Sequence, residues 1–307
     1  MIVCITFRIL KEIIVIAGPT ASGKTSLAVA LAKKLDCPVI SADSRQFYKE
    51  LSIGTAKPTR DEMDGVPHYF VDSHSIHNPL SAGQYEKEAL ALVNSLFEKH
   101  SQLIVVGGSG MFIDALIYGT DQLPHDAKVR EFWNEKLETH GIEYLQDKVK
   151  KVDPVYFQEV DIKNPVRLIR ALEIFEITGQ PFSELRKQKV KEPRFKTHYF
   201  VINHPRDVLY DRINHRVDLM IEAGLMEEVK NNKAHEGLQS LNTVGYKEIF
   251  DYLNDNISYE RAIELVKQNT RRYAKRQLTW FRKTKNAIWL TPNHTEDMVQ
   301  TIISTIQ

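Results

Sequence analysis

A stretch that could do chemistry, GPTASGKTS, begins at Gly18 and follows the apolar run IIVIA at residues 13–17. Gly18, Gly23, Lys24 and Thr25 match the pattern G-x-x-x-x-G-K-[ST]. In this pattern the backbone N–H groups point at phosphate oxygens, the lysine supplies a positive charge and the hydroxyl binds Mg²⁺. The motif therefore predicts a phosphate loop with a magnesium ion at Thr25. It leaves open which phosphate the loop holds.

The carboxylate that usually accompanies such a loop is missing. A Walker B aspartate is expected at the end of the apolar run at residues 102–108, but this run ends on Gly107 and Gly108. Asp43 in ISADSRQ instead follows another short apolar run. Because ligands gather at the carboxyl ends of strands in an open α/β sheet, we expect Asp43 to lie beside the phosphate loop. A lone aspartate after a strand is more often a turn or cap residue, so its role stays open here.

These residues need a scaffold that brings strand ends together. Six short apolar runs alternate with helical patterns: residues 13–17, 38–43, around 69, 102–108, around 200 and 287–290. This alternation predicts an α/β fold in which helices flank a parallel sheet. The interval 121–196 is charged, helix-patterned and free of strand-like runs, which indicates a helical insertion. We assign residues 11–120 and 197–307 to the core and residues 1–10 to an N-terminal extension.

The composition argues against two classes of protein only: those built on zinc sites or disulfides, and those that span a membrane. The 307 residues include 41 Lys and Arg against 40 Asp and Glu, and this balance does not exclude a local basic face. Cys4 and Cys37 have no spacing that suggests zinc or a disulfide framework. The apolar opening at residues 1–10 is too short to span a bilayer. We therefore expect a cytoplasmic protein that does not enter a membrane.

Residues 271–285 carry seven Lys and Arg residues and no acidic residue. Tyr273, Trp280 and Phe281 are interleaved with them. A basic helix with aromatic side chains suits RNA phosphates and bases, whereas a solvated charged face is the alternative. On residue type alone we expect Trp280 and Phe281 to pack in the core.

Several stretches in order resemble one family: GPTASGKTSLA, ISADSRQFYKELSIGTAKPT, VVGGSGMF, RALEIFEITG, TVGYKEI and RRYAKRQLTWFR. Together they resemble the bacterial tRNA dimethylallyltransferases, also called tRNA isopentenyltransferases, from about residue 13 to residue 290. The resemblance implies a P-loop NTPase-like fold. It also implies transfer of a dimethylallyl group from dimethylallyl diphosphate to the N6 amine of the adenosine 3′ of the tRNA anticodon, which yields diphosphate. The loop would then hold a leaving group, and a Walker B carboxylate becomes dispensable.

The resemblance also implies roles for individual residues. Asp43, Thr20 and Arg216 would be catalytic, with Asp43 receiving the proton of the amine and Arg212 the nearest competitor of Arg216. Thr25 would bind Mg²⁺. The diphosphate would be held by Gly18, Pro19, Thr20, Ala21, Ser22, Gly23, Lys24 and Thr25. The anticodon loop of tRNA would contact Asp43, Ser44, Arg45, Gln46, Ser109, Arg130, Arg167, Arg170, Arg271 and Lys275.

Three alternatives accompany this interpretation. A small-molecule or nucleoside kinase would use the loop for ATP binding, and an adenylate isopentenyltransferase would prenylate a free nucleotide. A P-loop RNA-binding protein without catalysis would leave Asp43 with no chemical role. The insertion and the basic helix favour tRNA over a free nucleotide, and we expect the enzyme to be a monomer.

Overall fold

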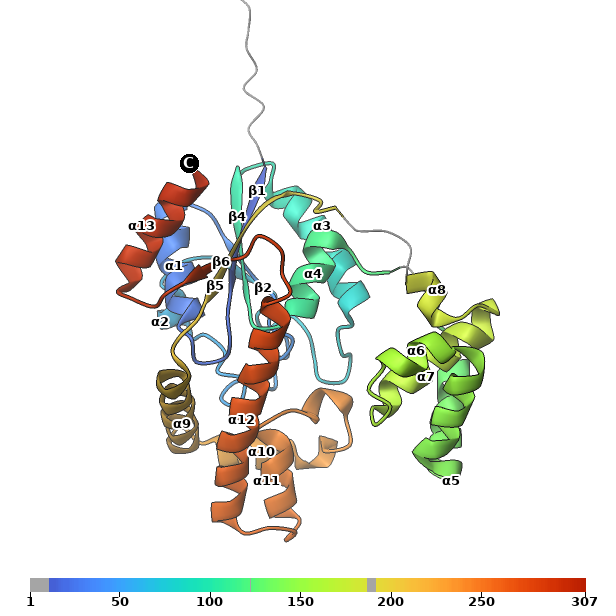
Figure 1. Cartoon of the computed structure of the whole chain (residues 1–307). Coiled ribbons are helices and arrows are strands. Elements are labelled where there is room, and N and C mark those ends of the chain that lie inside the picture. The colour runs from blue at the N-terminus through green and yellow to red at the C-terminus, as the bar shows by residue number, and fades with distance from the viewer. Residues whose placement is uncertain (1–10, 122, 187–191) are drawn as a thin grey trace, which may run out of the picture. The chain divides into compact units, whose positions relative to one another are not determined.

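The computed structural model describes residues 11–121, 123–186 and 192–307, so the predicted extension at residues 1–10 lies outside the described residues. The chain divides into two compact units (Figure 1). One contains the residues up to Gly119 and those from Pro193 onward, and the other runs from Thr120 to Glu192. The predicted insertion interval, 121–196, extends to the first residue of a strand of the larger unit.

All six runs predicted as strands form one parallel sheet, in the order β3-β2-β4-β1-β5-β6. In the central strand β1, Ala17 pairs with Gly107 of β4 and with Val201 of β5, so these strands end at one edge. The strands are β1 Glu12–Ala17, β2 Val39–Ser41, β3 His68–Tyr69, β4 Gln102–Gly107, β5 Lys196–Ile202 and β6 Ile288–Leu290.

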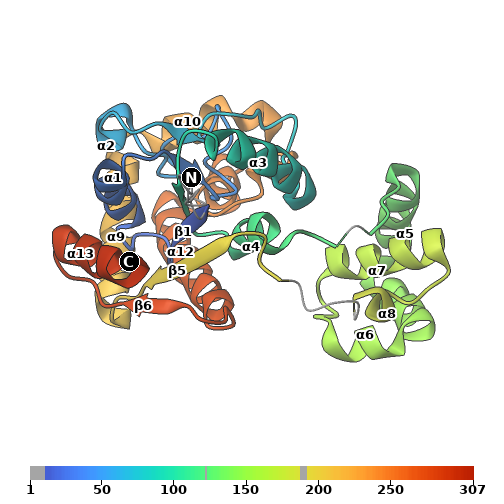
Figure 2. The ribbon, with the colours of Figure 1, turned by 90° about the horizontal axis from the view of Figure 1, so that it is seen from above.

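Helices cover both faces of the sheet, which is why β1 is apolar without alternation (Figure 2). Side chains of successive strand residues point to opposite faces. Ile14 and Ile16 pack with α1 (Lys24–Leu35) and α13 (Thr295–Ile306). Ile13 and Val15 pack with α3 (Ala82–Leu96), α4 (Gly110–Tyr118) and the buried Phe281. The sheet is thus the rigid base on which the phosphate loop stands.

A group of helices lies beyond the carboxyl edge of the sheet (Figure 1). Their core contains Leu225, Tyr246 and Phe250 and includes Tyr48 and Leu51 from the segment after β2. The group thereby fixes the chain between β2 and β3. The helices are α9 Arg206–Glu222, α10 Leu225–Asn231, α11 Tyr246–Leu253 and α12 Tyr259–Phe281, while the short α2, Arg60–Met63, lies between β2 and β3 in the chain.

The smaller unit is helical and has its own core. Asp153 is buried and joins two of its helices, since its carboxylate accepts hydrogen bonds from the Tyr156 N–H at 2.9 Å and the Ser183 N–H at 2.7 Å. The helices are α5 Ala127–Val152, α6 Pro154–Glu159, α7 Pro165–Thr178 and α8 Phe182–Arg186. No helix in the described part of either unit is long and apolar enough to cross a membrane.

Candidate active site at the carboxyl edge of the sheet

The phosphate loop connects β1 to α1, as the motif predicts. Ala21 adopts a left-handed backbone conformation with φ of 62°, which is uncommon for a residue with a side chain and must be held by its surroundings. Four side chains form hydrogen bonds with the backbone of the loop. Three of them contact carbonyl groups: Lys24 Nζ that of Pro19 (2.7 Å), Arg212 Nε that of Ala21 (2.8 Å) and a His204 ring nitrogen that of Ser22 (3.0 Å). The fourth, Gln277, accepts a hydrogen bond from the Thr20 N–H at Oε1 (2.9 Å).

Two cavities adjoin the loop. The larger, of about 760 Å³, is lined by the loop, the start of α1, residues 52–59 and part of α9. The smaller, of about 400 Å³, is lined by Ser44, Arg45, residues 242–248 and α12. Five residues line both cavities: Thr20, Asp43, Thr55, Arg216 and Met220. The three residues assigned to catalysis from the sequence therefore lie together where the two cavities meet.

Asp43 comes directly after β2, at the same sheet edge as the loop. Its Oδ1 accepts a hydrogen bond from the Arg45 N–H at 3.1 Å, which is the turn interaction that sequence alone favoured. The carboxylate of Asp43 is also accessible from the cavities, because the residue lines both of them. Its turn orients the carboxylate at their junction.

The charges at this junction interact with one another. Burial lowers the pKa of Lys24 to about 8, with the charge of Arg216 acting in the same direction and that of Asp43 opposing it. Burial likewise lowers the pKa of Arg216, and Asp43 again opposes the shift. Arg216 also interacts with Glu62 and Arg212, so three cations face two carboxylates and the junction stays positive, which suits a bound polyanion.

Arg212 and Arg216 lie one turn apart on α9 and have different contacts. Arg212 donates to the Ala21 carbonyl of the phosphate loop and lines only the larger cavity. Arg216 donates weakly to the Ala56 carbonyl, at 3.4 Å, and lines both cavities. The geometry thus favours Arg216 over Arg212 as the arginine that faces reacting groups.

The segment after Asp43 is locked to neighbouring strand ends. The Ser44 N–H donates to Ser109 Oγ at 3.2 Å, which links the ends of β2 and β4. Arg45 donates to the Ser240 carbonyl at 2.9 Å, and Gln46 Nε2 donates to the Ala56 carbonyl at 3.1 Å. The predicted tRNA-binding residues of this segment and Ser109 are therefore brought together around Asp43.

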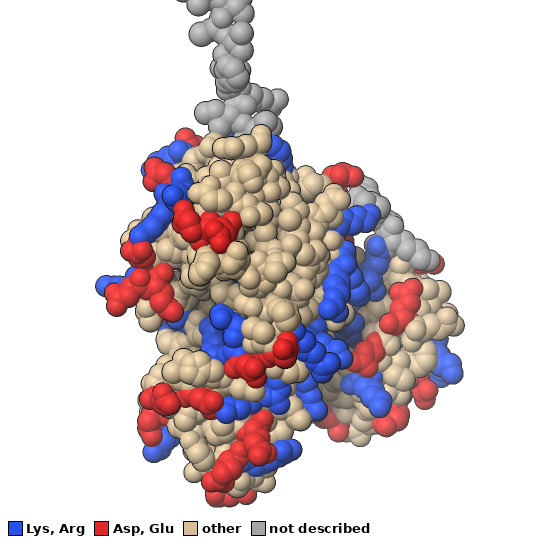
Figure 3. Space-filling model, turned by 60° about the vertical axis from the view of Figure 1, so that its left-hand side comes forward, with Lys and Arg blue, Asp and Glu red and all other residues tan. Residues whose placement is uncertain are grey.

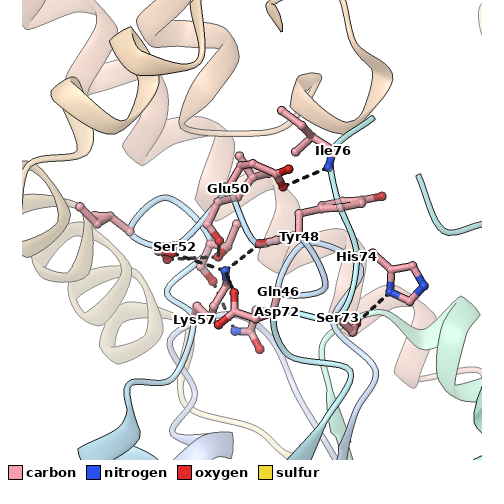
Figure 4. A network of polar contacts seen from close by, with 12 residues as sticks. Gln46, Tyr48, Glu50, Ser52, Lys57, Asp72, Ser73, His74 and Ile76 are labelled. Atoms are coloured by element: carbon pink, nitrogen blue, oxygen red, sulfur yellow. Dashed lines mark hydrogen bonds and ion pairs between the residues drawn. The ribbon is translucent and has the colours of Figure 1, made fainter. Parts of the chain in front are cut away.

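Lys57, in the segment between β2 and α2, has an ammonium group that points into a polar network (Figure 4). Its side chain is only 5% exposed, donates to the Tyr48 carbonyl at 2.7 Å and forms an ion pair with Asp72. In the same network Glu50 accepts a hydrogen bond from the Ile76 N–H at 3.1 Å. The network holds the chain between β2 and α2, which forms one wall of the larger cavity.

Tyr273 of α12 is a site residue whose role the sequence left open. It lines the smaller cavity beside Asp43. Burial raises its pKa to about 12, with the charge of Asp43 acting in the same direction and a hydrogen bond to Ser109 opposing the shift. The phenol therefore stays neutral near the carboxylate. Phe112, by contrast, is buried in the core, with ring centroids 5.3 Å from Phe47 and 5.2 Å from Tyr85.

The larger cavity offers oxygen ligands suited to Mg²⁺. The Thr25 hydroxyl, at the start of α1, lines it together with Asp43 and Glu62. Mg²⁺ prefers such hard oxygen donors and is often held by one or two protein groups plus substrate phosphates. The residues therefore fit a magnesium ion that is shared with a phosphate ligand. Among the described residues no group of three or more His, Cys, Asp or Glu could hold a metal on its own.

A family model described as IPP transferase matches residues 46–284. The chain belongs to the IPP transferase family. It is 46% identical to a tRNA dimethylallyltransferase of Cytophaga hutchinsonii, covering 97% of this chain and 98% of the relative, and 42% identical to tRNA dimethylallyltransferase 1 of Bacteroides fragilis, covering 97% and 99%.

Solved structures of the IPP transferase family share the fold. The full-length tRNA isopentenylpyrophosphate transferase of Bacillus halodurans superposes with a TM-score of 0.72 at 38% identity, covering 96% of this chain and 95% of that chain. A eukaryotic dimethylallyltransferase acting on tRNA superposes with a TM-score of 0.79 at 26% identity, covering 96% and 80%. The sheet of this family member is accordingly P-loop NTPase-like.

The basic helix α12 of this IPP transferase is not a uniform RNA-facing surface. Arg271 donates to Asn214 Oδ1 of α9 at 2.5 Å, and Lys267 forms an ion pair with Asp218 of α9, also at 2.5 Å. Lys275 is exposed. Lys and Arg side chains also gather on the lower half of the larger unit in the face shown in Figure 3. The positively charged face of α12 that includes Arg271 thus also packs against α9.

The expectation that both aromatic residues at the end of α12 lie in the core was half wrong. Phe281 is fully buried, as expected, but the Trp280 residue is 42% exposed. The indole N–H of Trp280 donates to Asp114 Oδ2 of α4 at 2.9 Å, so the ring lies on the surface with a fixed orientation. Residue type alone could not predict this exposure, because it depends on how the ring lies against Gly110 and Asp114 of α4 in the tertiary fold.

In the smaller unit, two of the three predicted tRNA-binding arginines are engaged within the unit. Arg130 and Arg170 form ion pairs with the fully buried Glu173 at 2.6 and 2.8 Å, and His125 contacts the same carboxylate at 2.5 Å. These contacts, which hold the start of the unit onto α7, lower the pKa of Glu173 to about 2 against its burial. Arg167 is exposed.

Proposed function

We propose that this chain transfers the dimethylallyl group of dimethylallyl diphosphate to the N6 amine of the adenosine 3′ of the anticodon in tRNA. The observation that carries the proposal is the junction of two cavities at Thr20, Asp43 and Arg216. The phosphate loop lines one cavity and α12 lines the other, so two substrates can approach the Asp43 carboxylate from different cavities. The names of the relatives supply the chemical identity of the two substrates.

The phosphate loop, residues 18–25, would hold the diphosphate. As the allylic C–O bond breaks, its electron pair stays on the bridging oxygen, and charge develops on the diphosphate. Lys24 and Arg216 would stabilise that charge, and the Thr20 hydroxyl would donate to it, which would lower the barrier by preorganised electrostatics. Mg²⁺ held through Thr25 would screen the diphosphate when bound.

Asp43 would accept the proton of the amine. The N6 lone pair is delocalised into the adenine ring, and the nitrogen becomes acidic only as its bond to the allyl carbon forms. A carboxylate at hydrogen-bonding distance then suffices as a general base for a late proton transfer. The electron pair of nitrogen forms the new N–C bond, and the proton passes to the Asp43 carboxylate.

The adenosine must leave the stack of the anticodon loop to reach Asp43, as in other base-modifying enzymes. The smaller cavity would receive it, with Ser44, Arg45 and Gln46 beside the base. Lys275 and Arg271 would face the RNA backbone from α12, and Arg130, Arg167 and Arg170 from the smaller unit. We further propose that the enzyme works as a cytoplasmic monomer.

The test is a reaction of purified protein with Mg²⁺, dimethylallyl diphosphate and unmodified tRNA, followed by nuclease digestion and detection of isopentenyladenosine. Product is expected with tRNA and none with free AMP. Asp43→Asn should abolish transfer and leave tRNA affinity within about twofold, because it removes the base but keeps the size of the side chain and the oxygen that accepts from the Arg45 N–H. Phosphorylation of a small molecule by ATP, with no prenylated tRNA, would refute the proposal.

A further inference from the structure

Gln277 follows Lys275 and Arg276 on α12, yet only 6% of the residue is exposed. Its side-chain amide is used at both ends. Oε1 accepts a hydrogen bond from the Thr20 N–H at 2.9 Å, and Nε2 donates to the Gly108 carbonyl, also at 2.9 Å. One side chain from α12 thus connects the phosphate loop to the end of β4.

Two glycines make room for this contact. A Cβ atom on Gly108 would lie 2.2 Å from Gln277 Nε2, and one on Gly110 would lie 2.1 Å from the Trp280 ring. Both distances are far below contact distance, so a side chain at position 108 would displace the Gln277 amide and one at position 110 would displace the Trp280 ring. Gln277 and Trp280 are three residues apart, and therefore α12 rests on the connection between β4 and α4 through one face.

This geometry gives a physical reason for the missing Walker B carboxylate. The strand end where it would stand carries Gly107 and Gly108, and the amide of Gln277 packs against this strand end instead. An amide contributes a donor and an acceptor without adding a negative charge beside a diphosphate. We propose that Gln277 is a positioning residue, which holds Thr20 at the junction of the two cavities and ties the phosphate loop to the helix expected to contact tRNA. The inference rests on the proposed function.

Only glutamine satisfies both partners in this place. Leucine would leave the Thr20 N–H and the Gly108 carbonyl without a hydrogen bond. Glutamate could still accept from the Thr20 N–H, but its ionised carboxylate would face the Gly108 carbonyl, with which it cannot form a hydrogen bond. Protonation restores a donor, so a Gln277→Glu enzyme should regain activity as the pH falls.

The experiment compares Gln277→Leu with Gln268→Leu, the same change elsewhere on α12. Single-turnover rates should fall about 10- to 100-fold in Gln277→Leu, since a small misplacement of a catalytic group has this effect, while the KM for tRNA stays within about twofold. In a Thr20→Ala background the same change should cost less than about twofold. Gln277→Glu should keep the fold and show the pH-dependent recovery.

Hydrogen exchange provides a readout that does not depend on prenylation. Exchange in a peptide that covers residues 18–26 should be faster in Gln277→Leu than in the wild type and unchanged in Gln268→Leu. If the wild type makes no isopentenyladenosine, the proposed function fails, while faster exchange would still support the positioning role. Unchanged exchange in the loop, or an equal loss of rate with and without the Thr20 hydroxyl, would overturn the inference.

Discussion

The charge state of Lys24 should control binding of the allylic substrate near pH 8. Burial and the positive charge of Arg216 lower the lysine pKa to about 8, whereas Asp43 opposes the shift. Above this pH the free enzyme loses a positive charge that the diphosphate requires. For a single site with pKa 8, the apparent Kd at pH 9 is about elevenfold above its low-pH value, whereas a lysine with an ordinary pKa of about 10.4 would change it by less than about 10%.

Calorimetry with dimethylallyl diphosphate and Mg²⁺ but without tRNA measures this dependence directly, from pH 6.5 to about pH 9.5. Two variants test the cause. Arg216→Gln removes a repelling charge and should move the inflection to higher pH, while Asp43→Asn removes an attracting charge and should move it to lower pH. Lys24→Arg should bind without an inflection, because arginine keeps its proton throughout this range.

The two neutralising variants weaken or strengthen binding through their own charges as well, so the position of the inflection is the informative quantity. Circular dichroism at each pH controls for unfolding. A wild-type affinity that stays flat to pH 9.5 would refute the reasoning, and so would a shift of the inflection in the same direction in both variants.

Three further predictions follow from single contacts. Arg216→Ala should lower kcat by about 10²- to 10³-fold. Arg212→Ala removes a hydrogen bond to the phosphate loop and should mainly raise KM for dimethylallyl diphosphate. Steady-state kinetics separates the two effects. Glu173→Gln should destabilise the protein by about 1 to 2 kcal/mol in chemical denaturation because it removes the buried charge that pairs with the partly exposed Arg130 and Arg170, and the exposed Glu176→Gln should have almost no effect. Lys275→Glu should weaken tRNA binding and reduce its salt dependence, as filter binding at several salt concentrations would show, and an unchanged salt slope would remove this residue from the RNA face.

The sequence was sufficient for the sheet because its signals are local. β1 is a short apolar run followed directly by the phosphate-loop motif, and a strand, a loop and a helix N-terminus follow from residue type and spacing alone. The position of Asp43 could also be predicted, since the carboxyl ends of parallel strands meet at one edge. Asp43 also forms the turn with the Arg45 N–H, so its turn role and its predicted position at the sheet edge are both confirmed, whereas its catalytic role stays a prediction.

The contacts between distant segments could not be predicted in this way. The hydrogen bond between Thr20 and Gln277 joins residues 257 positions apart. The spacing of Gln277 from Ala274 and Phe281 places it on the apolar face of α12, but no local pattern names its distant partner. The same holds for Lys57, whose positive charge is buried against Asp72. A basic helix indicates positive charge, but the side chains that pack against α9 depend on the tertiary fold.

The absence of a Walker B carboxylate and the contact between α12 and the phosphate loop have the same electrostatic reason. A nucleotide hydrolase uses that aspartate to orient a magnesium ion and a transferring phosphoryl group. In the proposed prenyl transfer the reacting carbon lies outside the phosphates, and the loop must stabilise a departing polyanion. A further carboxylate at the end of β4 would add to the charges of Asp43 and Glu62 and oppose this, whereas the amide of Gln277 holds the loop without adding charge. Among the described residues Asp43 is the only carboxylate that lines both cavities, and in the proposed reaction it receives the proton of the amine.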